Sequence, residues 1–293
     1  MDTKTINKPL TRLLSLTALA AVLLCGPQLY ADLRSATAAM ESQDNPLLLL
    51  SSSQGPIYIE LLPDEAPQNV ERFLSLAAGE VEFVDSVANS RFTPRYYDGM
   101  RFHRVLPGFV IQAGSPNYHP LGSPDQLLDD EINAFSLGLD RLPILAEDGS
   151  VNPVLNVGSQ AQFGERVLSH VYAGMGIDTV AELESRQSDV VQNLRELTVM
   201  RLYEQEGYEY QNEFTTRGIS RGTVALANDG PNRNGPEFFI ALDDLAWLNG
   251  RYTVIGRVVE GMDVADQIGN TAVDPQAFDP RSTMIYSLRR INR

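Results

Sequence analysis

Short runs of apolar and β-branched residues, separated by turn residues, recur along much of the chain. The first two runs cover residues 47–50 and 57–61 and flank a cluster of Ser, Gly and Pro, so they predict a β-hairpin. Turns such as Asn249-Gly250 separate six further predicted strands, over residues 100–105, 109–112, 223–227, 237–242, 253–259 and 284–288. Eight short strands with two short helices predict a mainly β fold, a closed antiparallel eight-stranded barrel.

Two segments carry apolar residues at the three- and four-residue spacing of a helix. The first begins at Pro67 and ends at Gly79, and its repeating apolar positions are Val70, Phe73, Leu74 and Ala77. The second runs as one predicted helix from an Asp178 cap to a Gly207 stop, with apolar positions Leu183, Val190, Leu194, Leu197 and Met200. We therefore expect residues 134–215 to form a largely helical insertion packed beside the barrel.

The chain begins with a basic segment followed by an apolar one. Residues 1–12 carry three basic residues and one acid, and residues 13–24 are largely apolar, which is the order of a secretory signal peptide. We expect cleavage after Ala31, which removes residues 1–31. A permanent membrane anchor is disfavoured because the apolar run is about half the roughly 20 residues that span a bilayer. Lipid attachment at Cys25 is disfavoured by the bulky leucines before it.

Removal of this leader makes the chain more acidic and free of cysteine. The whole chain has 23 basic and 38 acidic residues, and the leader holds three of the former and one of the latter. A mature protein without cysteine suits an oxidising compartment. We therefore expect a periplasmic or secreted protein with no membrane attachment after signal removal. Residues 32–46, rich in Ser, Ala and Gln, are predicted to be a flexible lead-in to structure that begins near Leu47.

Composition excludes several classes of function. A formal charge of −15 would repel nucleic-acid phosphates and anionic lipid, so we expect neither as a partner. A single cysteine rules out an internal disulfide and multi-cysteine metal sites, and no metal-ligand spacing relates the three histidines, His103, His119 and His170. We expect no cofactor and no metal. The acidic run 129–131 could bind a cation, but such a run is more typical of solvated surface.

One pattern suggests a secreted serine hydrolase. Residues 218–222 match the G-x-S-x-G elbow that presents a nucleophilic serine, here Ser220. That elbow needs a strand before the serine and a helix after it, whereas residues 223–227 have the pattern of a strand. The sequence therefore disfavours this function.

One predicted hairpin brings candidate groove residues onto adjoining strands. Arg104 and Gln112 lie eight residues apart on its two strands, with Phe102 and Phe109 available to wall an apolar groove. Alternation of side chains along a strand places His103 on the face opposite Arg104, which predicts that His103 is a buried, hydrogen-bonded core residue rather than a catalyst.

Together these segments resemble the cyclophilin-type peptidyl-prolyl isomerases. The resemblance covers residues 47–78, 96–131 and 221–293. Its motifs are the helix start at 66–73, the Phe102-His103-Arg104 and P-G-F-x-x-Q stretches, the Gly/Asn loop with its aromatic neighbours at 226–240, the stretch 247–256, and a segment at 260–268 similar to the tail of bacterial members. The resemblance implies one isomerase domain over residues 47–293, a barrel with two capping helices interrupted by the insertion 134–215.

The resemblance also implies roles for single residues. Arg104 matches the catalytic arginine, and Gln112 lies beside it as the second catalytic position. The substrate-binding positions that transfer are Phe109, Val110, Ala227, Asn228, Glu237, Phe239, Trp247, Leu248 and Tyr252. Two residues depart from the family pattern, since Glu237 stands where glutamine is usual and Tyr252 stands where many members have histidine.

The implied function is peptidyl-prolyl cis-trans isomerisation of X-Pro bonds in exported proteins, which assists their folding. The reaction breaks no bond, so it needs no nucleophile, metal or cofactor. The expected partners are proline-containing polypeptides and cyclosporin. An alternative is a chaperone module that binds proline peptides with little turnover, because Glu237 and the insertion could alter or cover the groove.

Overall fold

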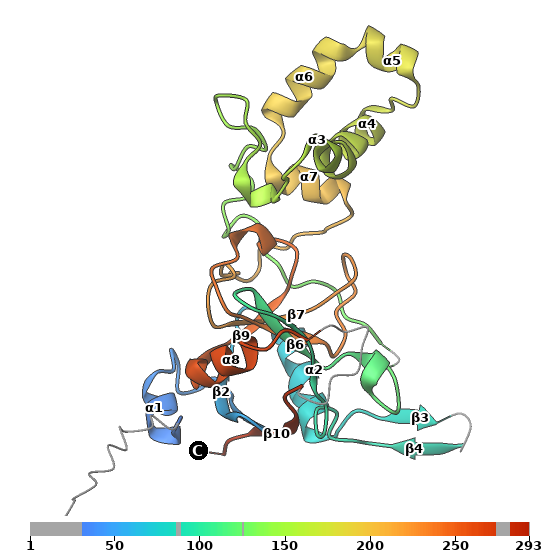
Figure 1. Cartoon of the computed structure of the whole chain (residues 1–293). Coiled ribbons are helices and arrows are strands. Elements are labelled where there is room, and N and C mark those ends of the chain that lie inside the picture. Colours follow the sequence, from blue (N-terminus) through green and yellow to red (C-terminus); the bar gives the residue numbers. More distant parts are fainter. Residues whose placement is uncertain (1–30, 86–88, 125, 274–281, 293) are drawn as a thin grey trace, which may run out of the picture.

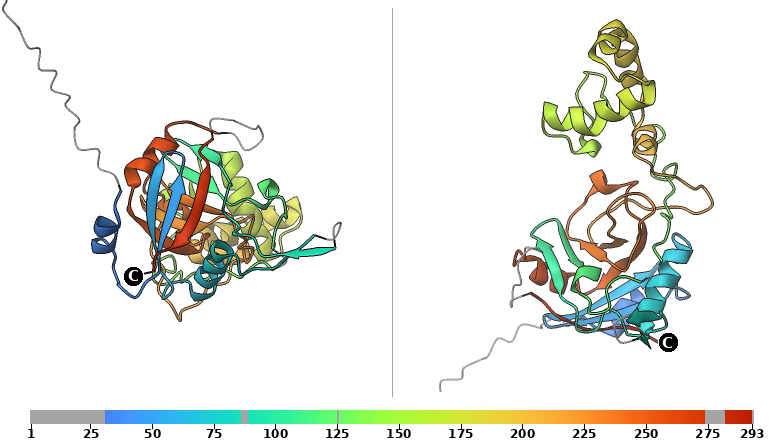
Figure 2. Two further views of the ribbon diagram at one scale, coloured as in Figure 1. Left: turned by 90° about the horizontal axis from the view of Figure 1, so that it is seen from below. Right: turned by 90° about the vertical axis from the view of Figure 1, so that its right-hand side faces the viewer.

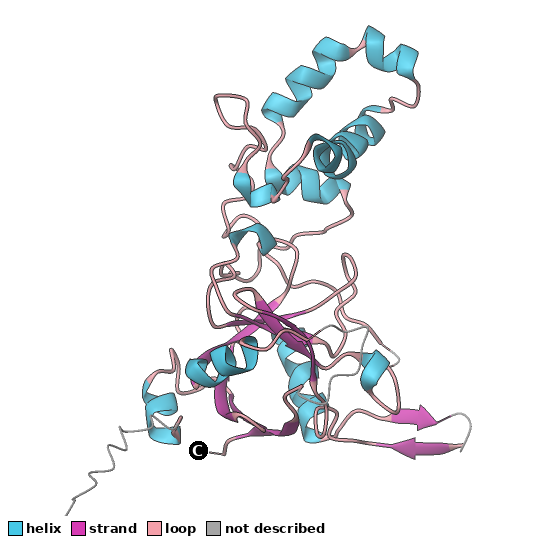
Figure 3. Cartoon of the chain, viewed as in Figure 1, coloured by secondary structure: helices cyan, strands magenta, loops and turns pink. Residues whose placement is uncertain are grey.

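The computed structural model describes residues 31–85, 89–124, 126–273 and 282–292 (Figure 1). The predicted leader up to Tyr30, with Cys25, lies outside these residues. The strands gather in one body, and most helices gather in the insertion, which projects from it (Figure 3). The mainly β fold with helices is therefore confirmed.

The barrel body is one antiparallel sheet of eight strands in the order β10-β1-β2-β9-β7-β8-β6-β5. The first two strands form the predicted hairpin, and the six other predicted strands are also present with slightly shifted ends. The bounds are β1 (Leu47–Ser52), β2 (Gly55–Leu61), β5 (Phe102–Leu106), β6 (Val110–Ala113), β7 (Thr223–Leu226), β8 (Phe238–Ala241), β9 (Val254–Glu260) and β10 (Ile285–Arg290).

The sheet curls into a barrel, but its two outer strands are not joined by a continuous ladder (Figure 2). Near this seam, Arg101 and Met284 form an isolated bridge, and the Phe102 amide donates to the Thr283 carbonyl at 3.0 Å. The prediction of a fully closed barrel is therefore met only in part.

Alternate strand residues point into the barrel and form its inner core. On β8, for example, Phe238 and Ile240 belong to this core. Two helices cover the barrel, α2 (Pro67–Ala78) and α8 (Met262–Gly269), and add to the same core the side chains of Val70, Phe73, Leu76, Val264, Ala265 and Ile268. Helix α2 starts with proline in its first turn and ends at Gly79, whose φ of +77° is in the left-handed region, as predicted.

A small hairpin lies outside the predicted elements. Strands β3 (Phe83–Asp85) and β4 (Ser90–Phe92) pair with each other and extend away from the barrel (Figure 1). Each has only three residues, which is too short for an alternating pattern to be recognised.

The prediction of a flexible lead-in over residues 32–46 is wrong. Helix α1 (Leu33–Ala38) begins there, and the Asp32 carboxylate caps it by accepting from the Ser35 amide at 2.8 Å. Ala36 and Met40 then pack against the barrel strands. The backbone amides of Glu41 and Ser42 also donate to Glu60, and such contacts leave no mark in a pattern of side-chain types.

The insertion, residues 134–215, is largely helical and has a hydrophobic core of its own. Its helices are α3 (Gln160–Phe163), a π-helical turn (Gly164–Leu168), α4 (Ser169–Met175), α5 (Val180–Ser185), α6 (Gln187–Glu196) and α7 (Val199–Gln205), with a 3-10 turn at Pro153–Leu155. The two ends of the insertion meet at the barrel, where the Asn133 amide donates to Thr216 Oγ1 at 2.8 Å.

The single helix predicted from Asp178 to Gly207 is wrong, because three helices fill this range. The first, α5, is capped by Thr179 in a capping box with Glu182. The chain becomes extended at Leu197, with ψ of 129°, and its carbonyl accepts from the Ile144 amide. The breaks between the helices let their apolar residues pack into one core. In a straight helix the same residues would be spread along its length.

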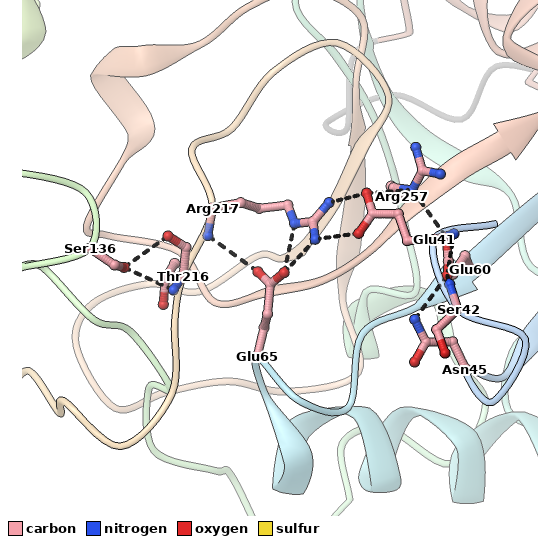
Figure 4. Close-up of polar contacts among 9 residues, drawn as sticks. All are labelled: Glu41, Ser42, Asn45, Glu60, Glu65, Ser136, Thr216, Arg217 and Arg257. Carbon is pink, nitrogen blue, oxygen red and sulfur yellow. Dashed lines mark hydrogen bonds and ion pairs between the residues drawn. The ribbon is translucent and has the colours of Figure 1, made fainter. Parts of the chain in front are cut away.

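A chain of carboxylates and guanidinium groups runs from the base of the insertion to the lead-in (Figure 4). Arg217 donates to both Glu65 and Glu41. Its hydrogen bond with Glu41, together with the charges of Arg217 and Arg257, lowers the pKa of Glu41 below its ordinary value. At the other end the fully buried Glu60 carboxylate accepts from Arg257 at 3.0 Å and from Asn45 at 2.8 Å.

Candidate functional site

The site lies on the outer face of the sheet, where the side chains not used by the inner core point. Arg104 on β5 pairs across the strands with Gln112 on β6, and Gln112 pairs in turn with Phe239 on β8. Three strands thus place a cation, an amide and an aromatic ring in one row. The predicted neighbourhood of Arg104 and Gln112 is confirmed by this register.

A cavity of about 150 Å³ opens beside this row. It is lined by Arg104, Phe109, Val110, Gln112, Ala227, Asn228, Phe239, Leu248 and Tyr252. These nine are all residues named from the sequence. The other two, Glu237 and Trp247, contact residues of the lining without lining the cavity themselves.

Aromatic rings form the apolar wall of the cavity. The Phe239 and Tyr252 rings meet edge to face, with centroids 5.4 Å apart. Phe109 stacks on Trp247 at 5.1 Å with an angle of 19° between the ring planes. Trp247 therefore supports the rim from behind Phe109, and the chain contains no second tryptophan.

A hydrogen-bonded row of polar groups forms the other side of the cavity. The Arg104 guanidinium donates to Gln112 Oε1 at 2.9 Å, and Gln112 Nε2 donates to the Glu237 carboxylate. An ionised carboxylate only accepts hydrogen bonds, so Glu237 fixes the Gln112 amide with its oxygen toward Arg104. One N–H of Gln112 remains for another acceptor.

His103 belongs to the same polar row, and its predicted place on the opposite face is wrong. Its Nε2 lies 3.0 Å from Glu237 Oε1, and its side chain is 9% exposed. A register shift between Phe102 and Arg104 inserts one extra residue into β5. Both His103 and Arg104 therefore stand outside, between the inward residues Phe102 and Val105. His103 makes the predicted hydrogen bond, but its partner is Glu237, a residue of the site.

Two opposing effects act on the Glu237 carboxyl. Burial alone would raise its pKa, but the hydrogen bond and the charge of His103, together with the Gln112 hydrogen bond, bring the pKa below its ordinary value. Glu237 is therefore ionised at neutral pH, and the direction of the Gln112 amide is set there.

A second hollow of about 420 Å³ adjoins the cavity and shares Gln112, Ala227 and Asn228 with it. Its remaining lining comes from Glu237 and from two loops, at Ser115, Pro116, Asn117, Ser123, Leu127, Asp229, Arg233, Gly235 and Pro236. The Gly/Asn loop is recognisable in the sequence, but its place beside this hollow depends on how the loop packs, which the sequence pattern does not show.

In the acidic run 129–131, Asp129 is exposed as predicted, but Asp130 and Glu131 are buried, so the prediction of solvated surface is wrong for these two residues. Glu131 is 5% exposed, and its carboxylate accepts from the backbone amides of Gln68 and Asn69 at the start of α2. Asp130 accepts from the Asn232 amide at 2.8 Å, and burial raises the pKa of its carboxyl. Both acids therefore anchor segments around the site.

The hydrolase pattern is also accounted for by the fold. Ser220 is exposed in a turn that leads directly into β7, and its amide donates to Thr223 Oγ1 at 3.1 Å. A strand follows the serine where an elbow would need a helix. The geometry thus contradicts a serine nucleophile at this position.

Two kinds of feature are missing from the part of the chain that the structure describes. Among residues 31–85, 89–124, 126–273 and 282–292 no three His, Cys, Asp or Glu side chains gather as metal ligands would. Within the same ranges no helix has both the length and the apolar character needed to cross a bilayer.

Comparisons with known proteins agree on one family. A model of the family "Cyclophilin type peptidyl-prolyl cis-trans isomerase/CLD" matches residues 47–289. The chain is 26% identical over 238 residues to peptidyl-prolyl cis-trans isomerase B of Streptomyces anulatus, covering 80% of this chain and 90% of that protein. It is also 26% identical to peptidyl-prolyl cis-trans isomerase-like 1 of Rhizopus delemar, covering 78% and 82%.

A solved structure is also similar. It is a Cryptosporidium parvum cyclophilin type peptidyl-prolyl cis-trans isomerase in the presence of the dipeptide Ala-Pro. The alignment covers 84% of this chain and 99% of that chain, with 17% identity and a TM-score of 0.45.

Proposed function

Because the chain belongs to the cyclophilin type peptidyl-prolyl cis-trans isomerases, we propose that the aromatic cavity beside Arg104 and Gln112 is where it isomerises X-Pro bonds. The observation that carries this proposal is the Arg104–Gln112 hydrogen bond at the edge of a cavity walled by aromatic rings. A protease-coupled isomerisation assay on a prolyl peptide tests it directly.

The reaction needs a pocket that fits the proline ring and one hydrogen-bond donor to the proline nitrogen. Rotation about the bond before proline meets a barrier of roughly 18–20 kcal/mol, and no bond is broken. Phe109, Phe239 and Leu248 would hold the proline ring. As resonance is lost, the proline nitrogen regains a lone pair, and the Arg104 guanidinium donates to it in the twisted state.

Two further groups would hold the peptide on either side of the reacting bond. The N–H of Gln112 that does not face Glu237 is free to donate to the substrate carbonyl. The main chain at Asn228, directly beyond the end of β7, would pair with the flanking peptide as a short added strand.

A proline-peptide-binding module with little turnover is the second candidate. Glu237 favours it, since the carboxylate occupies one Gln112 donor that a neutral side chain could leave free. The same isomerisation assay separates the two candidates, because the binding module would bind peptide without accelerating its isomerisation.

Trp247 offers a direct readout of binding. Because Trp247 stacks on Phe109, a ring that lines the cavity, a proline-containing peptide or cyclosporin is expected to change its emission. A matched peptide with alanine in place of proline is the control. An unchanged spectrum at saturating proline peptide would contradict the assignment of the cavity.

We further propose that the protein acts on exported polypeptides in a periplasm or outside the cell, where it assists folding. The proposal rests on the basic and apolar leader and on the lack of cysteine after it. N-terminal sequencing of the protein from its native cells is expected to read from Asp32. Recovery of an intact Met1, or of protein held in the membrane, would contradict export by cleavage.

A further inference from the structure

A short loop forms part of the rim of the cavity, and the insertion packs against this loop. Residues 249–253 connect a 3-10 turn, Ala246–Leu248, to β9. Leu248, directly before this loop, and Tyr252, within it, line the cavity. The 3-10 turn at Pro153–Leu155 of the insertion packs against the turn that carries Trp247 and Leu248.

Gly250 is the point of closest approach between the loop and the insertion. Its φ is +83°, and an added Cβ would lie 2.5 Å from the Leu139 side chain and 3.4 Å from the Tyr203 ring. The Tyr210 hydroxyl donates to the Gly250 carbonyl at 3.0 Å. Three side chains of the insertion therefore fix the backbone of one loop residue.

Arg251 makes a second link between this loop and the insertion. Its guanidinium donates to both carboxylate oxygens of Glu206, at 2.8 and 2.7 Å, and lies 4.3 Å above the Tyr203 ring. The side chains of Arg251 and Glu206 are only 18% and 15% exposed. A charge pair shielded from water in this way is screened by salt much less than a surface pair is.

The backbone of Arg251 faces the substrate side. Its carbonyl accepts from Asn228 Nδ2 at 3.0 Å, so it orients a residue of the cavity lining. Arg251 thus joins Glu206 and Tyr203 of the insertion, through its side chain, to Asn228 and the adjacent Tyr252, through its backbone.

We propose that the insertion positions the rim of the proline cavity through Arg251 and Gly250, and so sets the affinity for proline peptides. The proposal rests on the function assigned to the cavity above. Arg251, Glu206 and Tyr210 act as positioning residues. Arg104 and Gln112 lie on β5 and β6 and are placed by the pairing of these two strands, so the loop should govern binding more than the rotation step.

The test compares substitutions of two glutamates of the insertion, Glu206 and Glu204. Glu206→Gln removes the charge that pairs with Arg251. Glu204→Gln removes the charge that pairs with Arg201 on the surface of the insertion, where the Arg201 side chain is 71% exposed. For Glu206→Gln we expect the KM and the peptide Kd from Trp247 emission to rise about threefold to tenfold, with kcat changed less than about twofold. Glu204→Gln is expected to match the parent protein.

A second variant controls for an effect of Glu206→Gln that comes only from unfolding of the insertion. Tyr210→Phe removes only the hydrogen bond to Gly250 and should raise the peptide Kd in the same direction, with unchanged helical circular dichroism. Folded Glu206→Gln and Tyr210→Phe proteins with the Kd and Trp247 emission of the parent would overturn the proposal. The Trp247 readout needs no turnover, so an inactive parent would refute the isomerase mechanism while leaving this test intact.

Discussion

Arg104→Ala is expected to lower kcat/KM for a prolyl peptide by about 10²–10³-fold, the effect of losing one transition-state donor worth roughly 2.7–4 kcal/mol. The guanidinium is at the edge of the cavity and donates to Gln112 at 2.9 Å, so its removal takes away the donor and unties the Gln112 amide. The aromatic wall stays in place, so peptide affinity measured from Trp247 should change much less.

The control for this variant is Arg91→Ala. Arg91 lies on the protruding hairpin, and its side chain is 71% exposed, so its loss should not alter turnover. Arg104→Ala protein that isomerises as fast as the parent would refute the catalytic assignment. If parent and variant both lack turnover while peptide still shifts the Trp247 emission, the binding module takes the place of the enzyme mechanism.

Glu60→Ala should cost about 3–5 kcal/mol of the free energy of unfolding, the usual effect of removing one partner from a buried charge pair. The Glu60 side chain is fully buried and accepts from Arg257, from Asn45 and from the backbone amides of Glu41 and Ser42. Without Glu60 all these donors lose their acceptor, and the lead-in should detach from the barrel (Figure 4).

Urea unfolding followed by circular dichroism measures this cost, and limited proteolysis near residues 38–45 reports the detachment. Glu41→Gln is the matched control, because the Glu41 side chain is 45% exposed and its ion pairs are worth at most about 1 kcal/mol. Equal midpoints for Glu60→Ala and Glu41→Gln would show that the lead-in is not held through Glu60.

The parts of the site that follow from local pattern could be predicted from the sequence. The strand over residues 237–242 was predicted from its apolar pattern, and in the structure its adjacent residues Phe238 and Phe239 belong to the inner core and to the outer cluster respectively. The choice of Phe239 as the site residue came from the family resemblance. The tight turn between β5 and β6 sets the pairing of Arg104 with Gln112. That Trp247 lies beside the same cavity came from family resemblance, since no local pattern relates residues so far apart.

The sequence predictions were wrong where one inserted residue or one long-range contact overrides the local pattern of side chains. The bulge in β5 moved His103 to the outer face, and a bulge has no clear mark in side-chain types. Glu131 was assigned to the surface because its partners are backbone amides from a helix some 60 residues earlier. The order of the lead-in was missed for the same reason, since Glu60 binds backbone amides of the lead-in.

The meeting of Asn133 and Thr216 at the base of the insertion bears on how the chain folds. Strand β6 pairs with β8, so this part of the sheet forms only after a long stretch of chain has been bridged. Loop-closure entropy costs about 0.6 kcal/mol for each doubling of loop length. An insertion that collapses on its own core brings its ends within one hydrogen bond, and β6 and β8 then pair as though the connection were short. We therefore expect the insertion to add little to the entropy cost of pairing these two strands.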